Sequence, residues 1–68
     1  MKPGDLVTAW PCYLWEHNTA EKSGNTIGNM RAGELAIVLE VTVHGIRVIN
    51  SRGVVGWIDR KENLSEIG

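Results

Sequence analysis

Three side chains in this chain of 68 residues could act as soft metal ligands or as a nucleophile with its base: Cys12, His17 and His44. A structural zinc site needs four Cys or His ligands in two closely spaced pairs, and these three residues do not supply them. A Cys–His nucleophile would also need a group to orient the histidine and a site for the oxyanion. We therefore predict no metal site and no catalysis, and we interpret Cys12 as a thiol that is buried or lines a loop.

Phosphate binding and acid–base chemistry are also not indicated. The spacing Gly28-x₄-Gly33 is that of a phosphate-binding loop, but Glu34-Leu35 follows it instead of the Lys-Ser/Thr that would reach the phosphates. The eight acidic residues are spread over polar positions, and no spacing brings two of them together as a catalytic pair. The sequence predicts a non-enzymatic protein that needs no cofactor.

The aromatic residues are the first candidates for binding. There is no Phe, so each aromatic side chain carries a polar group, as suits a surface that is partly apolar and partly wet. Such residues either anchor a partner or plug the open end of a thin core, and both interpretations stay open. We predict a protein-binding surface made by the first loop and the adjacent strands, with the residues Trp10, Tyr13, Trp15, Ile49 and Trp57.

Three arginines could line one edge of the domain. Arg47 is expected to point outward from a strand, Arg52 to lie at a hairpin tip and Arg60 to lie in a turn. Together they could hold phosphates or an acidic partner, with Trp57 stacking on a base beside Arg47. The alternative is a scattered, solvated surface, because nearby acidic residues almost cancel this charge.

The elements that would position these side chains are short strands. Val, Ile and Thr make up 17 of the 68 residues, and these β-branched types favour pleated, half-buried positions. We expect strands at 6–10, 35–43, 46–50, 54–58 and 64–67, with tight turns at His44-Gly45 and Ser51–Gly53 and a 3₁₀ turn over 59–63. Residues 11–33 read as a long loop or an irregular hairpin, packed by Tyr13, Leu14, Trp15, Ile27 and Met30.

Two of these strands predict which side chains are buried. In the strand at 35–43, two sets of side chains alternate with a period of two, which indicates a strand with one buried face. The set expected on the buried face is Leu35, Ile37, Leu39, Val41 and Val43. The set expected on the other face is Ala36, Val38, Glu40, Thr42 and His44. In the strand at 54–58, we expect Val55 and Ile58 to point inward and Trp57 outward. Outward positions would leave Ile49 and Trp57 unburied unless the long loop or a second copy of the chain covers them.

Five short strands, two tight turns and a 3₁₀ turn predict an all-β fold, a small closed barrel formed by one domain over residues 1–68. The segments that carry a resemblance are Gly4-Asp5-Leu6-Val7, Gly33 to Val41, Gly53-Val54-Val55-Gly56-Trp57-Ile58 and Glu62-Asn63-Leu64. This order is similar to the five-stranded SH3-like barrels of unassigned role in tailed bacteriophages, whose pattern runs GDLV, GIVLEV, GRVGWI and LEVI. Residues 11–32 lie outside the resemblance.

The resemblance implies a fold rather than an activity, because this barrel hosts many unrelated functions. Eukaryotic SH3 domains follow Gly-Trp-Ile with a Pro-Ser-Asn-Tyr segment that helps to form a peptide groove, whereas Asp59-Arg60-Lys61-Glu62-Asn63 stands here. Binding of proline-rich peptides is therefore not expected. If the chain is encoded by a phage, it would work in the host cytoplasm or in the virion.

Charge and hydropathy narrow the function classes further. Seven Lys and Arg against eight Asp and Glu give a net charge of -1, unlike the basic balance of most autonomous nucleic-acid binders. The longest apolar run is the five residues Leu35–Leu39, too short to cross a bilayer, and Met1 to Asp5 has no signal-peptide character. We expect a cytoplasmic protein-interaction or self-association module. A nucleic-acid-binding accessory protein and a structural component of a virion are the alternatives.

Overall fold

The computed structural model describes residues 1–9, 11–17, 24–60 and 64–67. Within these residues the chain forms strands and no helix, so the predicted all-β class is confirmed. The strands are β1 (Leu6–Ala9), β2 (Cys12–Trp15), β3 (Thr26–Met30), β4 (Leu35–Val41), β5 (Gly45–Asn50), β6 (Val55–Asp59) and β7 (Leu64–Glu66). The predicted number of five strands is wrong, because β2 and β3 lie in the segment that reads as a long loop.

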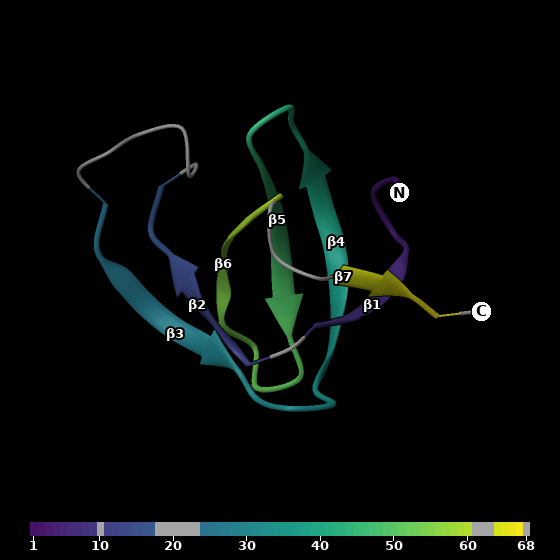
Figure 1. Cartoon of the computed structure of the whole chain (residues 1–68), viewed down its shortest axis with the longest axis horizontal. Coiled ribbons are helices and arrows are strands. Elements are labelled where there is room, and N and C mark those ends of the chain that lie inside the picture. Colours follow the sequence, from purple (N-terminus) through teal and green to yellow (C-terminus); the bar gives the residue numbers. More distant parts are fainter. Residues whose placement is uncertain (10, 18–23, 61–63, 68) are drawn as a thin grey trace.

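All seven strands belong to one antiparallel sheet in the order β3-β2-β6-β5-β4-β1-β7. Figure 1 shows this sheet curling, with the β2–β3 hairpin on one side of β5 and β4 and the pair β1 and β7 on the other. In the described part of the chain, β3 and β7 are the two ends of the strand order. The sheet is therefore a curled half-barrel with two edges.

The segment predicted as a loop is the irregular hairpin that the sequence left open. β2 and β3 pair antiparallel from Cys12↔Met30 to Trp15↔Thr26, with a shift of register after Leu14. Leu14 and Met30 are completely buried, as expected, whereas Tyr13, Trp15 and Ile27 are exposed. The hairpin is therefore held by two side chains in the core, and its other large apolar residues are left on the surface.

The core lies on the concave face of the sheet and takes side chains from every strand from β1 to β6. Its buried apolar residues are Val7, Ala9, Leu14, Met30, Ala36, Val38, Ile46, Val48 and Ile58. Gly56 on β6 is required by this packing, because an added Cβ would lie 2.7 Å from Cβ of Leu14. The absence of a side chain at Gly56 lets β2 lie close beside β6 in the sheet.

From Leu35 to Leu39, the buried face of β4 is the opposite of the predicted one, whereas Val41, which follows a shift of register after Val38, packs against the core as predicted. Ala36 and Val38 are buried, whereas Leu35, Ile37 and Leu39 are 37 to 45% exposed. The concave side of a small curled sheet offers little volume, and the long side chains of the β2–β3 hairpin already fill it. The smaller residues of β4 therefore face the core, and the larger ones face outward.

Other details of the prediction also need correction. Val55 is 40% exposed on the same face as Trp57, and Gly56 and Ile58 are the inward residues of β6. Gly45 does not adopt a positive φ, and the turn before β5 is closed by Thr42, whose hydroxyl accepts from the Gly45 amide at 3.0 Å. The predicted 3₁₀ turn falls largely on residues 61–63, outside the described residues.

Candidate binding surface

The face of the sheet opposite the core, which we call the outer face, carries a continuous row of aliphatic side chains. Leu6 on β1 lies opposite Ile37 on β4, Ile37 opposite Ile49 on β5, and Ile49 opposite Val55 on β6. The row continues past Leu6 to Ile67, whose backbone amide donates a hydrogen bond to the Leu6 carbonyl at 2.9 Å. We call these five residues the aliphatic row.

Most of the aliphatic row is open to solvent. Leu6, Ile37, Val55 and Ile67 are each 36 to 45% exposed, and Ile49 is half-buried. Neighbouring strands lie about 4.8 Å apart, so the row follows the sheet for about 19 Å. Contiguous exposed apolar patches often mark an interaction site.

A shallow hollow of about 240 Å³ lies along the same row. Its walls come from β1, β4, β5 and the turn after β5, and its lining residues are Leu6, Leu35, Ala36, Ile37, Ile49, Asn50 and Ser51. Most of these are apolar, and the hollow opens on the outer face. Its size and lining suit an apolar side chain of a partner rather than a polar metabolite.

Aromatic side chains extend the outer face beyond β6. Trp15 on β2 lies opposite Trp57 on β6, and the rings of Tyr13 and Trp15 meet edge to face with centroids 6.4 Å apart. Tyr13 is 64% exposed, whereas Trp57 is half-buried. Part of the predicted aromatic surface is thus brought together by β2 and β6, while Trp10 lies outside the described residues.

Arg47 is held against this aromatic group. Its guanidinium carbon lies 5.9 Å from the centroid of the Trp57 ring, and its Nη2 pairs with Glu40 Oε1 at 3.2 Å. Its Nε is buried and has no hydrogen-bond partner among the described residues. The Trp57 ring and the Glu40 carboxylate therefore hold this cation, which leaves that face of the ring partly covered.

The other two predicted arginines lie elsewhere and are also engaged within the chain. Arg60 follows β6, and its Nη1 donates to the Thr42 carbonyl at 3.2 Å. Arg52 lies in the turn between β5 and β6, and its Nε and Nη2 donate to the two carboxylate oxygens of Glu34 at 3.1 and 3.0 Å. The three arginines thus do not form one free basic edge.

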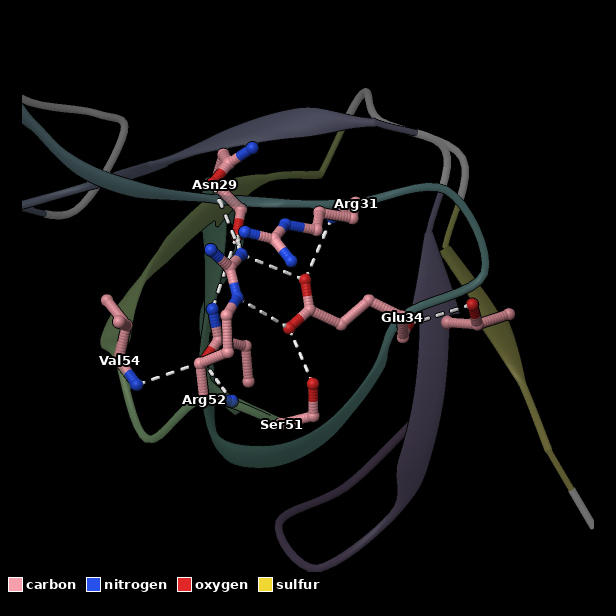
Figure 2. A network of polar contacts seen from close by, with 8 residues as sticks. Asn29, Arg31, Glu34, Ser51, Arg52 and Val54 are labelled. Atoms are coloured by element: carbon pink, nitrogen blue, oxygen red, sulfur yellow. Dashed lines mark hydrogen bonds and ion pairs between the residues drawn. The ribbon is translucent and has the colours of Figure 1, made fainter.

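Glu34, which the sequence analysis did not single out, is the centre of a polar network that Figure 2 shows. Besides Arg52, its carboxylate accepts from the Ser51 hydroxyl at 2.6 Å and from the Arg31 amide at 2.9 Å. Its side chain is only 6% exposed. These donors, the Arg52 guanidinium first and then Ser51 and Arg31, lower the pKa of Glu34 from 4.5 to about 2.

Asn29, which Figure 2 shows beside Arg52, and Asn50 link this network to the β2–β3 hairpin. Asn50 is buried, its Nδ2 donates to the Asn29 carbonyl at 3.2 Å, and its Oδ1 accepts from the amides of Arg52 and Val54 at 2.9 Å each. Arg52 Nη2 also donates to Asn29 Oδ1 at 3.2 Å. The network therefore fastens β3, an edge of the sheet, to the turn between β5 and β6.

The sequence itself contains a signal for the outer face. The run Leu35–Leu39 is apolar at all five positions, as is typical of strands covered on both faces. No comparable local signal marks Glu34, because the side chains of Ser51 and Arg52 that bind it are 17 and 18 residues away.

Residues with reactive or ligating side chains do not cluster in the described ranges. There, no group of three or more His, Cys, Asp or Glu side chains is placed to hold a metal ion. Cys12 borders a second hollow of about 240 Å³ with Pro11, Tyr13, Asn29 and Met30, none of which is a catalytic base. A search of the described residues also finds no helix of the length and apolar character that crossing a membrane requires.

Comparisons with known proteins give no family assignment. No protein-family model, curated protein or solved structure matches this chain. We therefore infer a function from the geometry and chemistry of the outer face.

Proposed function

We propose that this chain is a non-enzymatic protein-interaction module that binds another polypeptide through its outer face. The observation that carries this proposal is the orientation of β4, which buries Ala36 and Val38 and presents Leu35, Ile37 and Leu39 to solvent. A sheet with two apolar faces needs a covering layer on each of them. The fold covers the concave face, and a bound polypeptide would cover the outer one.

The polar network around Glu34 supports a structural rather than a chemical role for this carboxylate, whose pKa is the most strongly shifted among the acids of the described residues. With a pKa of about 2, this carboxylate is ionised at neutral pH and carries no proton to donate. Arg31, Ser51 and Arg52 already donate hydrogen bonds to it, so it is a poor general base as well.

We further propose that the curled sheet is an SH3-like barrel of the kind found in small accessory proteins of tailed bacteriophages. Support comes from four strands, β1, β4, β6 and β7, which overlap the segments quoted for the resemblance. Together with β5 they are adjacent in the order β6-β5-β4-β1-β7. The β2–β3 hairpin then stands where the long first loop of such a barrel would be. This part of the proposal places the chain in the host cytoplasm or in a virion.

Nucleic-acid binding is the second candidate, and one contact favours it. Arg47 lies beside Trp57, the combination that would hold a backbone phosphate and stack a base. However, Arg47 covers the ring and is paired with Glu40, and Arg52 is bound to Glu34. Binding of mixed-sequence DNA that weakens steeply with salt would favour this candidate over the protein-binding proposal.

A display library of random peptides tests the proposal. Wild-type chain is immobilised sparsely, so that copies cannot pair, and selected peptides are compared on two variants. Ile37→Glu puts a charge at the middle of the aliphatic row, and Val43→Glu puts the same charge on the turn before β5, where Val43 is 80% exposed. We expect ligands that bind wild type and Val43→Glu and lose at least about tenfold in affinity on Ile37→Glu.

Two outcomes would overturn the proposal. Selection could yield no ligand while the wild-type chain also fails to self-associate, or it could yield ligands that bind Ile37→Glu as well as they bind the wild type. Either result would mean that the outer face does not recognise polypeptides.

A further inference from the structure

We infer that the polypeptide that covers the outer face is a second copy of this chain, packed face to face about a two-fold axis that passes near Ile37. This inference rests on the proposed function and names the partner. A two-fold interface uses the same patch on both copies, so the patch must be complementary to itself. The aliphatic row meets this condition, because five apolar side chains would meet five others with no polar group between them.

The position of Ile37 defines where the axis would pass. Ile37 is the middle member of the aliphatic row, with Leu6 and Ile67 on one side and Ile49 and Val55 on the other. It also lines the hollow of about 240 Å³. Two sheets packed face to face lie about 10 Å apart with interleaved side chains, so a side chain from one row can enter the hollow of the other copy.

The charges around the aliphatic row fit pairing of identical copies. Glu40 and Arg47 stand beside the row on the side toward the aromatic group, and they neutralise each other within one chain. On the other side, Glu34 and Arg52 are likewise paired. Each copy therefore brings an apolar centre with a neutralised polar rim, which is the usual anatomy of an interface. A net charge of -1 adds little repulsion between copies.

A dimer interface would occupy a large share of the surface of this chain. A standard interface buries about 800 Å² on each partner, close to a fifth of the 4305 Å² accessible surface of this chain. The aliphatic row, the flanking Leu35 and Leu39 and the exposed edge of Trp15 lie on one face and are each available for burial. Leu35 and Leu39 are 43 and 37% exposed.

Sedimentation equilibrium over a micromolar to millimolar concentration series tests the inference. We expect the apparent mass of the wild type to rise with concentration from 7.5 kDa to twice that value. Ile37→Glu should raise the dissociation constant of the dimer at least about tenfold. Val43→Glu should associate as wild type does. Circular dichroism checks that each variant is folded, and Val55→Glu on β6 serves as a second test if Ile37→Glu does not fold.

A charge-reversal mixture makes the test specific for a two-fold arrangement. Ile37→Glu and Ile37→Lys should each remain monomeric, and an equimolar mixture should recover a heterodimer, because residues near the axis meet their own counterparts. Wild type that stays at 7.5 kDa throughout, or association that Ile37→Glu and Val55→Glu leave unchanged, would overturn the inference. If wild type is monomeric but peptides selected on it depend on Ile37, the proposed function stands and a different polypeptide is the partner.

Discussion

Arg52 donates hydrogen bonds to both carboxylate oxygens of Glu34 and so joins the turn between β5 and β6 to the start of β4. The same guanidinium also donates a hydrogen bond to Asn29 Oδ1 on β3, the strand at one end of the sheet. One side chain thus joins the turn between β5 and β6 to two residues that precede it by 18 and 23 positions in the sequence. Because the domain is small and its core is thin, links between its segments matter to its stability.

Loss of the Glu34 carboxylate should make stability less dependent on pH. The folded state lowers its pKa from 4.5 to about 2, so its contribution is present above pH 4.5 and is lost as pH falls from 4.5 toward 2. We expect Glu34→Gln to melt about 4–8 °C lower than wild type at pH 7 and to lose less stability on acidification. Melting curves at several pH values measure this, with Glu16→Gln as the exposed control. Parallel pH profiles for wild type and Glu34→Gln would contradict the expectation.

Replacement of Asn50 should destabilise the turn between β5 and β6. Asn50→Ala removes the buried acceptor of the Arg52 and Val54 amides and the donor to the Asn29 carbonyl. Leaving such groups unpaired costs about 1–3 kcal/mol. Urea unfolding monitored by tryptophan fluorescence measures this, and Ser65→Ala on the exposed side of β7 is a control that should change little. A loss in Asn50→Ala no greater than that of Ser65→Ala would show that the network does not hold the turn.

A methyl group at Gly56 should separate β2 from β6. In Gly56→Ala the new Cβ would lie 2.7 Å from Cβ of Leu14 and 3.3 Å from the Trp15 carbonyl oxygen. Overpacking of this kind costs about 1–3 kcal/mol. Leu14→Gly alone should also destabilise the fold, because it empties a fully buried site, but it removes the Cβ that the new methyl group would meet. The double variant should therefore be more stable than the sum of the two losses predicts. Additive losses, measured by urea unfolding, would mean that the two residues do not contact.

The orientation of β4 can be tested with one substitution at two adjacent positions. Val38→Thr puts a hydroxyl into the core and should cost about 1–3 kcal/mol, whereas Ile37→Thr changes an exposed position and should cost less than about 0.5 kcal/mol. Both are measured at low micromolar concentration, where a dimer would not contribute. A larger loss for Ile37→Thr would indicate that β4 buries its larger side chains after all.

Much of the fold could be predicted from local patterns. The β-branched content, the turn after residues 46–50, where Gly53 has a positive φ, and the outward position of Arg47 follow from composition, glycine placement and alternation, all of which act over a few residues. The β2–β3 hairpin was harder to predict, because Pro11 interrupts the first strand and residues 11–33 show no sustained period. Its pairing depends on Leu14 and Met30 reaching the core, which only distant strands complete.

The sequence by itself determined that the chain is all-β and that β4 is apolar on both sides. Only the tertiary structure decided that Ile37 faces solvent and Val38 the core, since alternation defines two faces but does not say which one is buried when both are apolar. The choice is made by volume, because Leu14, Met30 and Ile58 from other strands fill the concave side and leave room only for smaller residues. The long-range contacts that set this volume also create the outer face.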